Sequence, residues 1–107
     1  RDKKMLAHEE VNIRWDSAIA LAKMGDNSGK EIINNLLNRQ YYDNYKNVDK
    51  WEQDKAIMTA VQISSQLKDP VFKKNLVSLA MYDPNMNIRD AAIKILKTIY
   101  DIKISNG

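Results

Sequence analysis

Few residues of this sequence could carry out catalysis. Its only histidine, His8, precedes the first predicted helix within a charged stretch, and cysteine is absent. A catalytic triad needs a base held beside a serine or cysteine nucleophile, and the sequence offers no such set. The adjacent acids Glu9 and Glu10 lack an apolar pocket that would raise a carboxyl pKa. We therefore expect no enzymatic activity, no cofactor and no bound metal.

Gly25 and Gly29 flank a short polar segment that does not fit a phosphate-binding loop. Such a loop follows a strand and ends in Gly-Lys-Ser/Thr, whereas Gly29 is followed by Lys-Glu between predicted helices. We interpret the segment as a helix–helix turn. Gly25 suits the left-handed cap position, and Asn27 or Ser28 suits the N-cap of the next helix.

Charge and amide side chains indicate a binding surface instead. Residues 1–54 hold nine basic and ten acidic side chains, whereas residues 55–107 hold eight basic and four acidic ones. This imbalance favours an anionic partner for the second half. Asparagines and lysines gather on the exposed faces of two predicted helices. These candidate partner-binding residues are Lys30, Asn34, Asn35, Asn38, Lys73, Lys74 and Asn75.

A row of asparagines could hold the backbone of an extended peptide, because each amide offers one acceptor and two donors. The lysines would attract its acidic side chains. The alternative is an ordinary solvated helix face.

Tyrosines form the second candidate surface. Exposed tyrosines, here Tyr41, Tyr42 and Tyr45, are typical of recognition sites, although a long loop can also fold its aromatic side chains back onto the helices. For Trp15 and Trp51 we expect packing roles rather than stacking on a ligand.

All the elements that must position these residues are helices. The spacing of apolar residues predicts helices at about 11–24, 30–38, 51–67, 70–82 and 86–102. Residues 39–50 lack a sustained apolar period and predict a loop with room for one helical turn. Pro70 suits the first position of its helix, and Asp83-Pro84-Asn85 predicts the same arrangement before the last one. A length of 107 residues fits one all-α domain.

The first predicted helix is apolar over a wide arc. One stripe comprises Ile13, Ser17, Ala20, Leu21 and Met24, and a second comprises Trp15, Ala18, Ile19 and Ala22. A helix with so wide an apolar face must be covered from more than one side. Residues 5–7 are a candidate cover.

The sequence contains an internal repeat. Segments 13–21 and 88–96 align at an offset of 75 residues, and both have an aliphatic–Arg start, a small residue four positions after the aliphatic one, and a closing Leu. A third copy lies between them. It pairs Ser17 with Ile57 at an offset of 40, which leaves a second step of 35. Periods of this size are typical of stacked helical pairs.

This pattern resembles HEAT repeats, in particular the short HEAT-like repeats of the phycobilisome-lyase family. The stretches 13–26 and 83–96 are similar to that pattern, whereas the middle copy has Gln53 and Asp54 in place of the aliphatic–Arg pair. The resemblance covers about residues 11–102, in units of about 11–38, 51–82 and 85–104. It implies a right-handed α-α superhelix whose second helices line a concave surface.

The resemblance also implies roles for two arginines, because the Arg of such a repeat pairs with an Asp in the turn of an adjacent unit. We expect Arg89 to reach Asp69 or Asp54, and Arg14 to pair with a preceding residue. The alternative is a solvated Arg at a helix start. HEAT-like hydroxylases bind iron through several His-Glu pairs, but this sequence has one such pair, at residues 8–9.

Together these patterns predict a non-enzymatic scaffold that binds a partner protein or peptide on its concave helical surface. The resemblance leaves two alternatives, a bilin-lyase-related protein and a nucleic-acid-binding module. HEAT-like DNA glycosylases place Trp, Asp and Arg in a basic groove, but a net charge of +3 is small for a surface that follows phosphates.

Three expectations concern the context of the domain. No stretch is long and apolar enough for a membrane span. Because the sequence begins at Arg1, we expect a piece of a longer chain; a short array closed by its own ends is the alternative. We favour the cytoplasm as the compartment.

Overall fold

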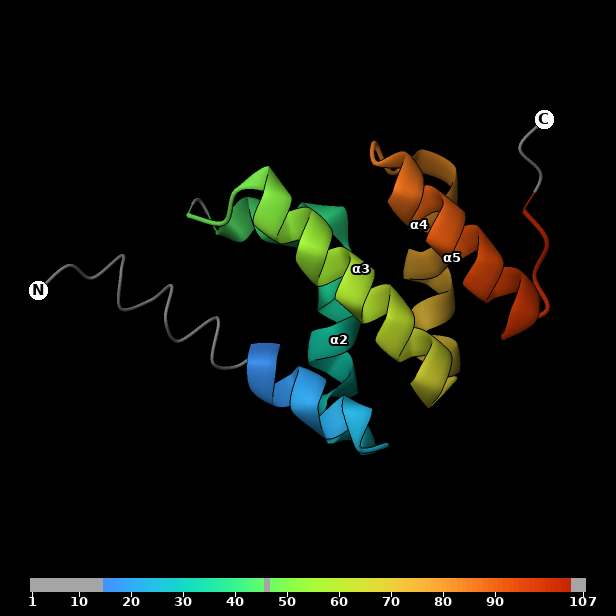
Figure 1. Cartoon of the computed structure of the whole chain (residues 1–107), viewed down its shortest axis with the longest axis horizontal. Coiled ribbons are helices and arrows are strands. Elements are labelled where there is room, and N and C mark those ends of the chain that lie inside the picture. The colour runs from blue at the N-terminus through green and yellow to red at the C-terminus, as the bar shows by residue number, and fades with distance from the viewer. Residues whose placement is uncertain (1–14, 46, 105–107) are drawn as a thin grey trace, which may run out of the picture.

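The computed structural model describes residues 15–45 and 47–104 of the 107-residue chain. Within these ranges the regular structure is helical and no strand is present, which confirms the all-α class there. Residues 15–23 form the first helical segment. The elements that follow are η1 (Asn27–Gly29), α2 (Lys30–Leu36), η2 (Arg39–Asn44), α3 (Lys50–Leu67), η3 (Pro70–Phe72), α4 (Lys73–Tyr82) and α5 (Met86–Thr98) (Figure 1).

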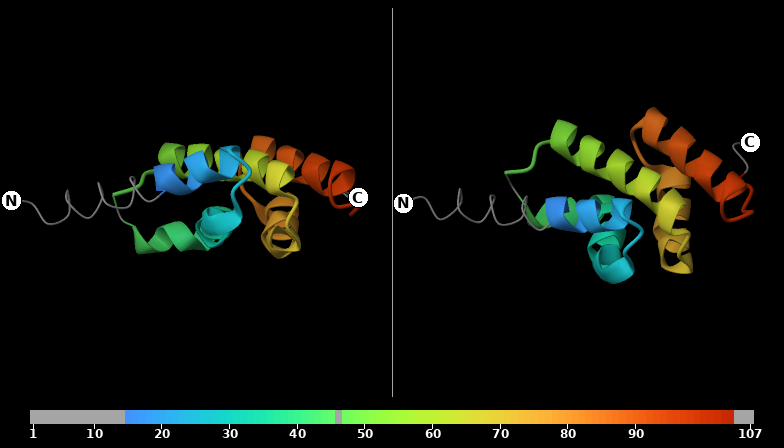
Figure 2. Two further views of the ribbon diagram at one scale, coloured as in Figure 1. Left: turned by 90° about the horizontal axis from the view of Figure 1, so that it is seen from below. Right: turned by 60° about the horizontal axis from the view of Figure 1, so that its bottom comes forward.

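The helices lie in two layers. Residues 15–23, α3 and α5 form one layer, and α2 and α4 form the other (Figure 2, left). Between the layers, α2 packs against α3, and α4 packs closely along α5. Apolar side chains from both layers form a continuous buried core between them.

Polar contacts show that neighbouring helices within a layer run in the same direction. In one layer, polar contacts join α2 and η2 to the segments before and after α4, and the contacting residues are 39 and 44 positions apart in sequence. In the other layer, polar contacts join α3 to both ends of α5, and the contacting residues are 31 and 36 positions apart. These separations are near the sequence offsets of 40 and 35. The contacts are Lys30–Asp69 and Arg39–Asp83 in one layer, and Asn85–Asp54 and Tyr100–Ser64 in the other.

The first helical segment is rotated relative to the sequence prediction. Ala18 and Ala22 are buried, whereas Ser17 and Ala20 are exposed and Met24 is 80% exposed. The prediction that the stripe through residues 13–24 belongs to the core is therefore wrong for these exposed residues. Burial aligns Ala18 with the buried residue 57, at an offset of 39 instead of 40. A shift of one residue turns a helix face by about 100°.

Two glycines set the turn after this segment, for different reasons. Gly25 has a φ of 82°, in the left-handed region, as predicted. At Gly29 the constraint is space, because a Cβ would lie 3.0 Å from the Cβ of Ala18 and 3.1 Å from its Cα. The absence of a side chain at Gly29 thus lets η1 approach the first helical segment closely.

Several helix ends differ from the predictions. Asp26, rather than Asn27 or Ser28, caps η1 by accepting a hydrogen bond from the N–H of Ser28. Pro70 takes the first position of η3 as predicted. Pro84 does not begin α5, because the side chain of Asn85 provides the N-cap.

The last helix ends at Thr98, earlier than the predicted residue 102. Asp101 has a φ of 57°, and the N–H of Ile102 donates to the carbonyl of Leu96 over 2.8 Å. Aspartate enters the left-handed region more readily than most side chains, so it can end a helix without glycine.

Candidate functional site

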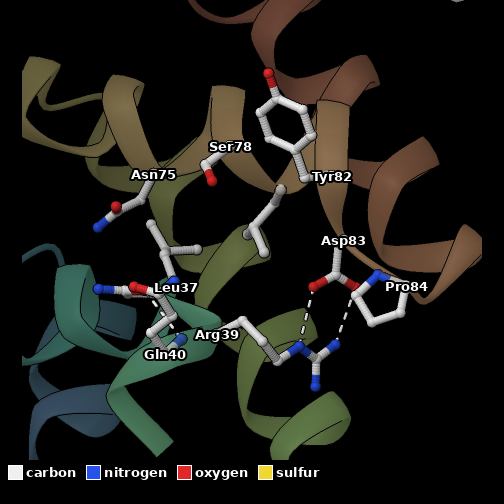
Figure 3. Close-up of a pocket in the computed structure, with 10 residues that line it drawn as sticks. Leu37, Arg39, Gln40, Asn75, Ser78, Tyr82, Asp83 and Pro84 are labelled. Carbon is white, nitrogen blue, oxygen red and sulfur yellow. Dashed lines mark hydrogen bonds and ion pairs between the residues drawn. The ribbon is translucent and has the colours of Figure 1, made fainter.

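A groove of about 270 Å³ lies between η2 and α4, in the layer that α2 and α4 form (Figure 3). Two predicted partner-binding residues, Asn38 and Asn75, line it. Three further uncharged polar residues that were not predicted, Gln40, Ser78 and Tyr82, also line it. The complete lining is Leu37, Asn38, Arg39, Gln40, Asn75, Ser78, Leu79, Tyr82, Asp83 and Pro84.

Helical spacing explains which side chains of α4 reach the groove. Asn75, Ser78 and Tyr82 are three and four residues apart and therefore share one face. Lys74 lies four residues before Ser78, on the same stripe. Lys73 lies four residues before the half-buried Val77 and belongs to another flank of the helix. The same spacing, counted from Asn75, could have identified Ser78 and Tyr82 from the sequence.

The predicted row of asparagines is partly satisfied within the protein. The side-chain N–H₂ of Asn75 donates to the backbone carbonyl of Asn34 over 3.0 Å and to its side-chain oxygen over 2.9 Å. Asn38 caps η2 by accepting from the N–H of Gln40. Asn34 therefore fixes α4 beside α2, and Asn35 is exposed away from this contact. The expectation that all these amides face a partner is therefore wrong for Asn34, because its carbonyl groups accept hydrogen bonds from Asn75.

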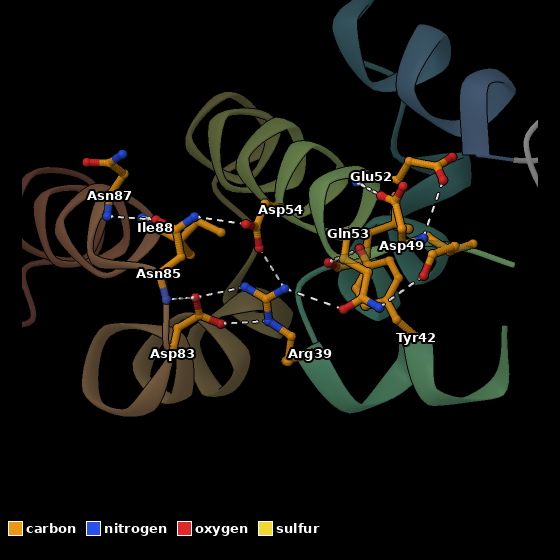
Figure 4. A network of polar contacts seen from close by, with 12 residues as sticks. Arg39, Tyr42, Asp49, Glu52, Gln53, Asp54, Asp83, Asn85, Asn87 and Ile88 are labelled. Atoms are coloured by element: carbon orange, nitrogen blue, oxygen red, sulfur yellow. Dashed lines mark hydrogen bonds and ion pairs between the residues drawn. The ribbon is translucent and has the colours of Figure 1, made fainter. Parts of the chain in front are cut away.

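Arg39 lines the groove and lies at the centre of a network of polar contacts (Figure 4). Its Nε and Nη2 donate to both carboxylate oxygens of Asp83, over 3.0 and 2.9 Å, and its Nη1 lies 2.8 Å from Oδ1 of Asp54. The side chain of Asp83 is completely buried. Burial acts to lower the pKa of Arg39, but the hydrogen bonds and charges of Asp83 and Asp54 outweigh it and raise the pKa. The guanidinium therefore remains charged and acts as a clamp.

Arg39, rather than Arg89, contacts Asp54 in the structure. Asp54 lies against Arg39, and Asp69 pairs with Lys30 over 3.2 Å. The prediction that Arg89 reaches either carboxylate is wrong, because other cations already hold both of them. Among the ion pairs of residues 15–45 and 47–104, none includes Arg89.

Lys30 and Asp69 lie at the other end of the α2–α4 contact. The pKa of Asp69 is lowered mainly because its carboxylate accepts a hydrogen bond from the N–H of Val71; burial opposes this, and Lys30 adds to it. The charge of Lys30 is thus offset within the protein. Lys73 and Lys74 are exposed.

The tyrosine segment folds back onto the helices. Tyr42 is 1% exposed, and its hydroxyl donates to the carbonyl of Leu36 over 2.6 Å. Burial raises the pKa of this hydroxyl. Tyr41 and Tyr45 are half-buried, their hydroxyls lie 3.1 Å apart, and all three rings surround Trp15 at centroid distances of 5.7 to 6.2 Å. The predicted recognition surface is therefore wrong for Tyr42, which belongs to the core.

The two tryptophans have opposite environments. Trp15 is 7% exposed and packs as predicted, whereas Trp51 is 69% exposed, so the packing role predicted for it is wrong. The buried face of α3 passes through Ile57 and Val61, and helical spacing places Trp51 on a different flank with Lys55. The Nζ of Lys55 lies 5.3 Å from the centroid of the Trp51 ring.

Arg14, His8, Glu9 and Glu10 lie outside the described residues. Within the described ranges, no group of three or more His, Cys, Asp or Glu side chains could hold a metal ion. None of the helices there is both long and apolar enough to cross a bilayer. What the groove offers is a set of uncharged hydrogen-bonding groups beside one paired cation.

No protein family, curated protein or solved structure matches the chain significantly.

Proposed function

We propose that the chain is a non-enzymatic scaffold whose groove between η2 and α4 binds an extended segment of a partner protein. The observation that carries this proposal is the character of the groove walls. Gln40, Ser78 and Tyr82 supply uncharged donors and acceptors, and Asn38 and Asn75 add the side-chain groups that they do not use within the protein. The charged lining residues, Arg39 and Asp83, pair with each other.

An extended peptide suits these walls because its backbone alternates N–H and C=O groups. Amide and hydroxyl side chains can accept hydrogen bonds from the N–H groups and donate hydrogen bonds to the C=O groups. Tyr82 is 75% exposed, so its ring offers a broad contact area at little cost in side-chain entropy.

Charge favours an acidic residue at one position of the bound segment. Lys74 lies on the stripe that leads to Ser78, and it is exposed. Lys30 contributes less because Asp69 offsets its charge. We therefore place an aspartate or glutamate of the partner beside Lys74, near the Asn75 end of the groove.

The proposal also includes the arrangement of the helices in a superhelix. We infer that the two layers are part of a right-handed HEAT-like superhelix, with α2 and α4 on its concave side. The repeated direction of neighbouring helices and their sequence separations support this arrangement.

The test begins with a random heptapeptide library displayed on phage and selected on the immobilised full chain. Selected peptides are synthesised and their affinities measured by calorimetry. We expect enrichment of aspartate and glutamate. The variant Ser78→Trp, which fills the groove, should weaken binding at least tenfold, and Lys74→Glu should weaken binding of the acidic peptides.

Gln62→Trp is the matched control, because Gln62 is exposed on α3 in the other layer. It should leave the affinity unchanged. Selected peptides that bind Ser78→Trp as tightly as the unaltered chain would refute the groove as the binding site.

A further inference from the structure

A second hollow, of about 300 Å³, lies between residues 15–23 and α3 in the other layer. The two helices run side by side in the same direction there (Figures 1 and 2). Both tryptophans of the chain line this hollow. The full lining is Trp15, Asp16, Ile19, Leu36, Trp51, Glu52, Lys55, Ala56 and Thr59.

The floor of the hollow is apolar and one wall is an exposed indole ring. Leu36 is completely buried, and Ile19 and Ala56 are half-buried. Trp51 leaves 69% of its surface exposed beside them. Tryptophan is enriched among the residues that dominate binding energy at protein interfaces, because it buries a large apolar area.

Among the described residues that line the hollow, two are acidic and one is basic. Asp16 is exposed and forms no ion pair with another described residue. Glu52 adds a second carboxylate and also closes the capping box of α3. Lys55 is the one basic residue among the described lining residues, and its Nζ lies over the Trp51 ring. The formal charge of these three residues is thus opposite in sign to the net charge of +3 of the whole chain.

We propose that this hollow docks an amphipathic helix of a partner protein, with an apolar anchor against Trp51 and a lysine or arginine beside Asp16. A channel between two parallel helices over an apolar floor suits the apolar stripe of a third helix. The acidic rim selects a basic flank on that helix. The same carboxylates repel phosphates, which argues against a nucleic acid here. This surface is separate from the groove between η2 and α4.

The probes are two designed 18-residue helical peptides with identical leucines at i, i+3, i+4 and i+7 spacing. One carries lysines on its polar flanks, and the other carries glutamates at the same positions. Calorimetry with the full chain gives the affinities. Tryptophan emission reports the location, because both tryptophans line the hollow.

We expect the lysine peptide to bind at least tenfold more tightly than the glutamate peptide and to change the tryptophan emission saturably. General attraction to a protein of net charge +3 would produce the opposite order. Trp51→Ala should weaken binding of the lysine peptide at least tenfold. Asp16→Lys should make the glutamate peptide bind more tightly than the lysine peptide. Lys55→Ala should strengthen binding of the lysine peptide.

Met24→Ala is the control, because Met24 is 80% exposed and does not line the hollow. It should leave both affinities unchanged. Equal affinities for the two peptides, a tighter glutamate peptide, or no binding of the lysine peptide would overturn the proposal. So would duplex DNA that changes the tryptophan emission and competes with the lysine peptide.

Discussion

The groove between η2 and α4 and the hollow between residues 15–23 and α3 have similar volumes but different walls. Uncharged polar side chains and an internal ion pair surround the groove, whereas two indole rings and an acidic rim surround the hollow. The contacts that stabilise the two sites differ as well. Polar bridges between distant residues hold the groove, and close apolar packing holds the hollow. One helical framework can therefore present two surfaces of different chemistry.

Removing the clamp of the groove should have the largest effect. Arg39→Met leaves the buried carboxylate of Asp83 without its cation, and we expect a loss of about 3 kcal/mol in the free energy of unfolding. Urea denaturation followed by circular dichroism measures it. Arg89→Met is the control and should cost less than about 0.5 kcal/mol. A similar loss in both variants would contradict the assignment of the clamp to Arg39.

The packing that supports the hollow is tested at Gly29. Gly29→Ala places a Cβ about 3 Å from Ala18, and we expect a loss of roughly 1–3 kcal/mol in the free energy of unfolding as the first helical segment shifts. The shift should also change the emission of Trp15 and Trp51, which line the hollow.

Gly25→Ala separates this effect from backbone strain. Its φ of 82° is unfavourable for alanine, but no atom lies within 4 Å of its Cβ position. We expect a loss of about 1 kcal/mol and unchanged tryptophan emission. Changed emission in Gly25→Ala alone would contradict the packing argument.

The amide bridge of the groove should contribute less. Asn75→Ala removes the donor to both carbonyl groups of Asn34, and we expect a loss of about 1 kcal/mol. Asn34→Ala retains the backbone carbonyl, so its loss should be smaller. A double-mutant cycle measures the coupling between the two side chains, and zero coupling would exclude a bridge in solution.

Tyr100 lies outside both surfaces and gives a dependence on pH. Burial, with a smaller contribution from Asp69, raises the pKa of its hydroxyl to about 12. In the unfolded chain the hydroxyl titrates near its ordinary pKa of about 10. The contribution of the Tyr100 hydroxyl to the free energy of unfolding is therefore complete below about pH 10 and is lost as the pH rises toward 12. Tyr100→Phe should flatten this part of the stability profile, and an unchanged slope would contradict the assignment.

The sequence predicted the helices well because their apolar spacing and their breaking residues act locally. Helices α3 and α4 lie within a few residues of their predicted ranges, and the left-handed turn at Gly25 follows from glycine chemistry. The sequence predicted only some of the residues that line the candidate groove. Asn38 and Asn75 line it as the helix faces indicated, whereas Tyr82 required the spacing to be followed further along α4.

The remaining features depend on contacts that sequence spacing does not reveal. The repeat alignment gave an offset of 40, whereas the burial of Ala18 and Ile57 indicates an offset of 39. Arg39 and Arg89 both carry a guanidinium, but tertiary placement decides which one meets Asp83 and Asp54. Tyr42 is buried because the η2 segment folds back toward Trp15, a long-range contact that no local pattern predicts.

Nuclear magnetic resonance of the labelled full chain, titrated with a selected acidic heptapeptide, tests the groove most directly. Our account predicts that the largest amide shifts occur at Gln40, Ser78 and Tyr82, and that the shifts disappear in Ser78→Trp. Shifts centred on Asp16 and Trp51 instead, or shifts that persist in Ser78→Trp, would contradict it.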